Sequence, residues 1–417
     1  MLNVRKCFGT GFERFALIVI ATTFGLYSIT LLAKGDGSQS PREIIESHYS
    51  KLKKSYDRNG ALDEEIETSL KELFHLEKLA SQVLQNHWTD LNRYEQKKFV
   101  EAFTISLQKQ ILTEIGNHSS RGLPSVRFNS EETKEKSAKL NLTVSGDKGG
   151  SNLTLFFLKY AKEGWKVSNV KYEDESLLRE YYSYCDEILD DFSIPYLIAE
   201  IKGADYVVLD DFEAGEVGKL PVGWSWRDRD DDKNKPYTIR KENGNKYLAA
   251  RDEGESVILG KDVKWNLNKY PYISFRWRAI ELPVGGDERY GKTVDSAAGI
   301  YLVYKKKLGL IPESVKFVWS TTLPVGAYMK RSGIGKPWMV VAASGDEHLG
   351  EWRTFTFNAR EAYKKTFGGD PPDDPVGLGI LSDANSTHSK AYTDYDDIRA
   401  LKHADADSGV KQFMKAE

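Results

Sequence analysis

The stretch "GWKVSNVKYEDESLLREYY", residues 164–182, decides how the first half of the chain folds. Its pattern predicts a strand headed by Trp165, an acidic turn, and a helix that begins at Ser176. The run before it, "NLTLFFLKY" (residues 152–160), is apolar on both faces, which predicts a strand that is buried on both sides. Such a corner of strand and helix fits an ordinary packed core, and it also fits the wall of a pocket for an apolar ligand.

Helical patterns precede this corner. In "KELFHLEKLASQVLQNHW" (residues 71–88), apolar residues recur at spacings of three and four, which predicts one amphipathic helix. Asn92 followed by Glu95 predicts the N-cap of a second amphipathic helix. From "AKLNLTVSG" (residues 138–146) onward the period is two, which is typical of strands. Residues 36–203 are therefore predicted to form an α+β domain, with helices over an antiparallel sheet.

Short strands separated by Gly, Pro, Asn and Asp turns fill the second half of the chain. In "YPYISFRWRAI" (residues 270–280), Arg276 and Arg278 share the polar face of a strand. The two arginines either bind a sugar or a lipid phosphate, or they form a surface ion-pair cluster. The pattern predicts an all-β jelly roll or β-sandwich over residues 204–403, followed by a flexible tail over residues 404–417.

The first 35 residues predict an export signal. Basic residues precede an uncharged run over residues 15–33, which as a helix spans about 28 Å, close to the thickness of a hydrocarbon core. Basic residues before such a run place the remainder of the chain outside the cytoplasm. The segment is either cleaved as a signal peptide or kept as an inner-membrane anchor.

Composition and motifs argue against several classes of function. The net charge of -3 gives no electrostatic support for nucleic-acid binding. The two cysteines, Cys7 and Cys185, lie on opposite sides of the apolar run, so no disulfide framework is expected, and Cys185 is predicted to be a small buried apolar residue. Because the sequence contains no HExxH, GxSxG or glycine-rich phosphate loop, we predict no enzymatic activity and no catalytic residues.

Four carboxylates frame the second half. Asp211 and Glu213 open it, and Asp396 and Asp397 close it. Many jelly-roll carbohydrate-binding modules hold a structural calcium ion between their first and last strands, and calcium takes about six to eight oxygen ligands. The four residues are therefore candidate ligands of a structural calcium ion, and the alternative is that they flank turns in solvent. No other cofactor is predicted.

The first half resembles the MlaC family, also called the toluene-tolerance family. Residues 70–111, "LKELFHLEKLASQVLQNHWTDLNRYEQKKFVEAFTISLQKQI", resemble the family's paired helices, and "EGWKVSNVKYEDESLLREYY" (residues 163–182) resembles its strand-to-helix corner. The resemblance covers about residues 40–202, although the closing helix departs from the family pattern. It implies a soluble periplasmic carrier that shuttles phospholipids between the outer and inner membranes.

The resemblance also implies partners and a lipid cavity. The partners are phospholipid, an inner-membrane lipid-transport ABC complex and an outer-membrane lipid donor complex. A packed core is the alternative to the cavity. The predicted lipid-binding residues are Leu73, Leu84, Trp88, Phe99, Phe103, Leu107, Leu142, Leu155, Phe157, Trp165 and Val167.

The second half resembles an uncharacterised bacterial envelope domain of unknown function. Blocks such as "LDDFEAGEVGKLPVGW" (residues 209–224) and "AYTDYDDIRAL" (residues 391–401) carry this resemblance, which covers about residues 207–402 and implies a galactose-binding-like jelly roll. Two functional hypotheses follow. The protein is a periplasmic phospholipid carrier with an accessory β-domain, or it is a carbohydrate-binding or carbohydrate-active envelope protein that acts through the jelly roll.

Overall fold

The computed structural model describes residues 39–57, 62–118, 125–146, 149–173, 175–226, 236–307, 311–330, 333 and 335–404. The predicted export segment and nearly all of the predicted tail lie outside these residues. Within the described ranges, no helix combines the length and the apolar character that a membrane span needs.

The chain divides into two compact units between Asp190 and Asp191. Our sequence prediction places the boundary between residues 203 and 204, so helix α9 (Ile194–Lys202) is grouped here with the second unit. The reason is that α9 contacts strand β6 (Tyr206–Asp210) directly after it in the chain.

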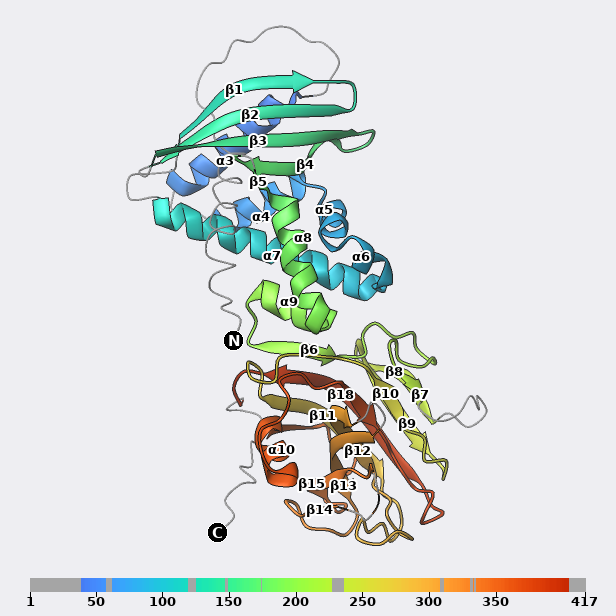
Figure 1. Cartoon of the computed structure of the whole chain (residues 1–417). Coiled ribbons are helices and arrows are strands. Elements are labelled where there is room, and N and C mark those ends of the chain that lie inside the picture. The colour runs from blue at the N-terminus through green and yellow to red at the C-terminus, as the bar shows by residue number, and fades with distance from the viewer. Residues whose placement is uncertain are drawn as a thin grey trace. The chain divides into compact units, whose positions relative to one another are not determined.

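The first unit is built on an antiparallel sheet with the strand order β1-β2-β3-β4-β5, and helices gather along one side of it (Figure 1). The strands are β1 (Ser125–Thr133), β2 (Ser137–Gly146), β3 (Gly149–Tyr160), β4 (Gly164–Tyr172) and β5 (Glu175–Ser176). The helices are α3 (Pro41–Asp57), α4 (Leu62–Leu73), α5 (Leu76–Leu84), α6 (Asn86–Asp90), α7 (Arg93–His118) and α8 (Leu177–Asp191).

The single helix predicted over residues 71–88 is wrong, because this stretch is divided among α4, α5 and α6. Phe74 leaves the helical path and forms a parallel backbone bridge with Val167 of β4. His75 then caps α5, since its Nδ1 accepts a hydrogen bond from the amide of Lys78 (3.4 Å). Gln85, with a φ of 46°, separates α5 from α6.

The predicted start of α7 is confirmed. The amide of Glu95 donates to Asn92 Oδ1 (3.1 Å), and the amide of Asn92 donates to the carboxylate of Glu95 (3.0 Å). This reciprocal pair satisfies two amides that the first turn of a helix leaves without partners.

One face of the sheet is buried and the other meets solvent. On β3, Leu153, Leu155 and Phe157 are buried, whereas Phe156 is half-buried and Leu158 is 38% exposed. The prediction that this strand is buried on both sides is therefore wrong. The helices lie along one side of the sheet only (Figure 1), and an antiparallel sheet can leave its second face in water.

A buried histidine joins α3 to α4. His48 Nδ1 lies 3.1 Å from Ser69 Oγ, and His48 Nε2 lies 3.5 Å from the Glu72 carboxylate. Burial, assisted by the charge of Lys51, lowers the pKa of His48 to about 4, although Glu72 acts in the opposite direction. The imidazole is therefore neutral at pH 7.

The second unit is a β-sandwich, as predicted. One sheet has the order β14-β15-β13-β12-β17-β10-β7, and the other has the order β16-β11-β18-β9-β8, with β6 also paired to β18. The remaining elements are β7 (Ser225–Trp226), β8 (Tyr237–Glu242), β9 (Asn245–Asp252), β10 (Leu259–Lys261), β11 (Tyr272–Glu281), β12 (Ala298–Lys307), β13 (Ile311–Ser320), β14 (Tyr328–Lys330), β15 (Trp338–Ser344), β16 (Arg353–Asn358), α10 (Ala359–Phe367), β17 (Gly377–Ile380) and β18 (Ala391–Leu401).

Aromatic side chains fill the space between these two sheets. Phe275 and Trp277 of β11 face Phe317 and Trp319 of β13, with ring centroids 5.8 and 6.4 Å apart, respectively. Tyr395 of β18 meets the Trp277 ring edge to face at 6.4 Å. The predicted fold class, α+β followed by a β-sandwich, is therefore confirmed.

We expect Trp277→Ala to lower the free energy of unfolding of the second unit by about 3–5 kcal/mol, because it empties a fully buried indole site. Trp277→Phe should cost less, because it refills part of the volume and removes an indole N–H that has no hydrogen-bond partner among the described residues. Urea unfolding of the two variants measures the difference. Equal losses would contradict this account of the core.

We expect the first unit to lose stability as the pH falls from about 6.5 to about 4. The pKa of His48 is depressed in the folded state, so in this window the unfolded chain binds a proton that the folded chain does not, and acid favours unfolding. The total effect is up to about 3 kcal/mol. Urea unfolding at pH 7 and pH 4 checks this, and His48→Gln should show a smaller difference between the two conditions. An equal difference in both proteins would assign the acid sensitivity to other groups.

Candidate functional site

Most of the predicted lipid-binding residues share one apolar interior, between the helices and the buried face of the first sheet. Helices α4 and α5 contact β4, α3 contacts β2, and α7 contacts α4 and α5. Trp88 differs from the others, because it is half-buried on the short helix α6. The residues that we call the apolar interior are all buried: Leu73, Leu84, Phe99, Phe103, Leu107, Leu142, Leu155, Phe157, Trp165 and Val167.

Sequence reasoning missed Tyr181 of α8, which packs beside Phe103. The two rings meet edge to face with centroids 5.0 Å apart, and Phe103 stacks on Phe99 at 6.3 Å. Gln110 Nε2 donates a hydrogen bond to the Tyr181 hydroxyl (2.9 Å), and burial raises the pKa of Tyr181 far above its ordinary value. The spacing of four between Tyr181 and Cys185, both buried on α8, is the pattern that predicts this inward face.

Cys185 behaves as predicted. It is buried, and burial together with the negative charge of Asp186 raises the pKa of its thiol to about 12. A thiol with such a pKa stays protonated and is a poor nucleophile. Cys185 therefore contributes apolar surface to the first unit and offers no covalent chemistry.

The apolar interior consists of aliphatic and aromatic side chains, so it can recognise a ligand only through apolar surface. Each methylene group that leaves water contributes about 0.8 kcal/mol. This chemistry suits an acyl chain, and the same contacts suit a packed core. The assignment of these residues to lipid binding stays a prediction.

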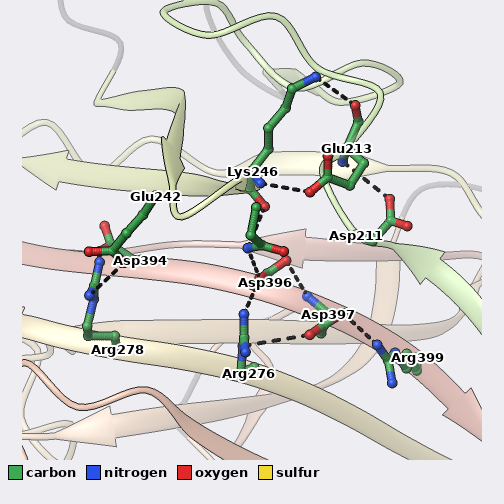
Figure 2. Close-up of polar contacts among 11 residues, drawn as sticks. Asp211, Glu213, Glu242, Lys246, Arg276, Arg278, Asp394, Asp396, Asp397 and Arg399 are labelled. Atoms are coloured by element: carbon green, nitrogen blue, oxygen red, sulfur yellow. Dashed lines mark hydrogen bonds and ion pairs between the residues drawn. The ribbon is translucent and has the colours of Figure 1, made fainter. Parts of the chain in front are cut away.

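The four predicted calcium ligands lie in a polar cluster of the second unit (Figure 2). Strands β8, β9, β11 and β18 contribute to this cluster, together with the turn after β6. Its members are Asp211, Glu213, Glu242, Asn245, Lys246, Arg276, Arg278, Asp394, Asp396, Asp397 and Arg399.

Asp396 and Asp397 are paired with arginines. Asp396 Oδ2 accepts hydrogen bonds from Arg276 Nη2 (2.5 Å) and Asn245 Nδ2 (2.8 Å). Asp397 accepts a hydrogen bond from Arg399 Nη2 (2.7 Å), and its other oxygen lies 3.7 Å from Arg276 Nε. Burial raises the pKa of Asp396, although the hydrogen bonds from Asn245 and Arg276 act in the opposite direction.

Asp211 and Glu213 shape a turn. The amide of Lys246 donates to the Glu213 carboxylate (2.7 Å), and Lys246 Nζ donates to the Glu213 carbonyl (2.9 Å), as Figure 2 shows. The amide of Glu213 donates to Asp211 Oδ1 (3.3 Å). Across the described ranges, no group of three or more His, Cys, Asp or Glu side chains is placed to hold a metal ion. The calcium ion stays a prediction that these contacts do not support.

The two arginines of β11 have carboxylate partners on the same sheet. Asp394, which is fully buried, accepts hydrogen bonds from Arg278 Nη2 (2.7 Å) and Arg251 Nη2 (2.7 Å). The guanidinium carbons of Arg276 and Arg278 each lie 4.7 Å from the ring centroid of Trp352. Both arginines form ion pairs, as one of the two interpretations expects, but their partners Asp394 and Asp396 are buried and do not lie at the surface.

Comparison with known protein families matches each half separately. Residues 42–203 match the model of the MlaC protein family, and residues 223–399 match the model of a family described as protein of unknown function (DUF3047). Both predicted resemblances are confirmed by these matches. No curated protein matches the chain at a significant level.

Two solved structures that are similar to part of this chain come from different kinds of protein. One is the phospholipid-binding protein from Ralstonia solanacearum in complex with a phospholipid, with 12% identity over 39% of this chain and 92% of that chain, and a TM-score of 0.34. Another is a loop-swap mutant of Necallimastix patriciarum Xyn11A, with 11% identity over 40% of this chain and 95% of that chain, and a TM-score of 0.20. The chain therefore joins a segment that matches the MlaC family model to a segment that matches the model of a family of proteins of unknown function.

Proposed function

We propose that residues 42–203 bind phospholipid and that the protein carries it through the periplasm. The observation that supports this proposal is the match of these residues to the MlaC family. The apolar interior is consistent with it, since the residues that the family resemblance assigns to a lipid cavity are, apart from Trp88, buried between the helices and one face of the sheet.

The energetics of acyl-chain transfer suit a reversible carrier. A two-chain phospholipid with about 30 methylene groups would lose about 24 kcal/mol of apolar stabilisation if it crossed water unprotected. A membrane and an apolar protein interior relieve this cost to a similar extent, so the net free energy of extraction is small. The interior of the carrier therefore has to lower the free energy of the acyl chains about as much as the bilayer does, and no more. Loading and delivery can then both proceed.

The proposed partners follow from this role. An outer-membrane donor complex would supply phospholipid to the carrier. An inner-membrane ABC-type lipid-transport complex would exchange phospholipid with it. The transfer breaks no covalent bond, so the proposal requires no catalytic residue. The second unit is then an accessory domain of the carrier.

We expect the purified full chain to release diacyl phospholipid into organic solvent and to take up fluorescent phospholipid from vesicles, because the apolar interior shelters acyl chains. Mass spectrometry of the extract and a vesicle transfer assay measure the two quantities. A protein that releases no phospholipid and takes none up would refute the carrier function.

We expect Phe103→Asp to weaken lipid uptake by at least about tenfold, because it places a carboxylate among acyl chains, where an unpaired charge is heavily penalised. Leu158→Asp is the matched control, since it makes the same kind of change on the solvent-facing side of β3. Circular dichroism and thermal melting report whether each variant folds.

The outcomes separate the two interpretations of the apolar interior. A folded Phe103→Asp protein with lost uptake supports a lipid cavity, because water can enter the cavity when lipid is absent. Loss of folding together with uptake favours a packed core. A folded variant with normal uptake shows that Phe103 does not contact lipid.

A further inference from the structure

A row of side chains crosses the seven-stranded sheet of the second unit on the face that is turned away from the aromatic core. Lys316 of β13 pairs directly with Tyr301 of β12, which in turn pairs with Gly379 of β17, and Met339 of β15 flanks Lys316 on the other side. The neighbour of Lys316 in β13, Phe317, contacts the core aromatics of the other sheet. Because side chains alternate along a strand, Lys316 points to the opposite face.

Two glycines allow this row to lie flat on the sheet. A Cβ atom at Gly299 would lie 2.3 Å from Lys316 Cε, and a Cβ atom at Gly379 would lie 3.2 Å from Tyr301 Cβ. Any larger residue at Gly299 would push the lysine stem outward. Because neither glycine carries a side chain, space remains above this face of the sheet.

A cavity of about 420 Å³ occupies this space. Its volume lies within the range of small-ligand sites, roughly 300–1,000 Å³. The apolar part of its wall includes Val303, Met339 and Leu378. The polar part includes Ser256, Tyr301, Ser314, Lys316, Asp383 and Asn385.

Two charged groups of the wall, Lys316 and Asp383, are buried and act on each other electrostatically. Lys316 is only 3% exposed, its Nζ lies 5.4 Å from the ring centroid of Tyr301, and no carboxylate of the described residues forms an ion pair with it. Asp383 is 7% exposed, and the charge of Lys316 and hydrogen bonds from Ser256 and Asn385 favour its ionised form, but its Oδ1 is buried without a hydrogen-bond partner among the described residues. Such groups are costly unless a ligand or water satisfies them. Lys336, the other lysine of the wall, is exposed.

Buried carboxylates hold the cavity walls in place. Asp252 accepts hydrogen bonds from the amides of Ser256 and Ala384, both at 3.0 Å, and so ties together two segments of the wall. Asp295 accepts hydrogen bonds from the amides of Ser386 (3.2 Å) and Thr387 (2.6 Å). The site is therefore formed before any ligand arrives, which lowers the entropic cost of binding.

We propose that this cavity binds a neutral saccharide of one or two sugar rings. The ligand has to accept a hydrogen bond from Lys316 and donate one to Asp383, and neighbouring sugar hydroxyls do both. A sugar also presents further hydroxyls to Ser256, Ser314 and Asn385, and an apolar C–H face to the Tyr301 ring. A simple anion would leave Asp383 unsatisfied, and a simple cation would leave Lys316 unsatisfied. The site is independent of the lipid-binding function proposed for residues 42–203.

The test uses the full chain and a panel of glucose, galactose, N-acetylglucosamine, maltose and cellobiose. Saturation-transfer NMR identifies a binder, and calorimetry measures its Kd. We expect at least one sugar to bind, and Lys316→Met and Asp383→Asn to weaken its binding by at least about tenfold, because each removes one charge-assisted hydrogen bond. Lys364→Met, an equivalent change on the exposed face of α10 outside the cavity wall, should leave the Kd unchanged.

Three results would overturn the proposal. The first is that no sugar of the panel binds at 10 mM. The second is that a sugar binds with the same Kd to the wild type and to folded Lys316→Met and Asp383→Asn proteins. The third is that glutamate or inorganic phosphate binds in a Lys316-dependent manner while the sugars do not. If Lys316→Met fails to fold, Asp383→Asn decides, because it preserves the size and shape of the side chain.

Discussion

The backbone bridge between Phe74 and Val167 is the constraint on which the layout of the first unit depends. It ends α4, fixes where α5 begins, and attaches the helical layer to β4. Both helices also contact α7, so the aliphatic and aromatic residues of α7 are held over the same face of the sheet. This short extended segment interrupts the helical path and so positions α4 and α5 over the sheet.

The two functional hypotheses drawn from the sequence have separate locations in the molecule and do not exclude each other. The proposed lipid-binding site is the apolar interior, which is formed by helices and a five-stranded sheet. The proposed saccharide site is a small cavity that glycines and buried carboxylates shape on a different sheet. In the polar cluster, which includes the four predicted calcium ligands, Asp396 and Asp397 are paired with arginines.

Features that depend on nearby residues could be predicted from the sequence, and features that depend on distant partners could not. The N-cap at Asn92 and Glu95 is a contact within one helical turn, and the alternation along β11 reflects a local period of two. The interruption at Phe74 depends on a partner strand far along the chain, and the exposure of Leu158 depends on which face the helices cover. For the same reason, the row formed by Lys316, Tyr301 and Gly379 could not be predicted from the sequence, because it forms only when three strands pair in this register.

The position of β18 has a consequence for how the second unit is made. This final strand lies between β11 and β9, and it also pairs with β6, the first strand of the unit. Before residues 391–401 have been synthesised, the edges of β11 and β9 that pair with β18 have no partner strand. The sheet then lacks its middle strand. Long-range strand pairing of this kind is slow, and open edges invite pairing with other chains. Synthesis of the last strand is thus the step that closes the second unit, and a chain truncated before it would expose two half-sheets to aggregation.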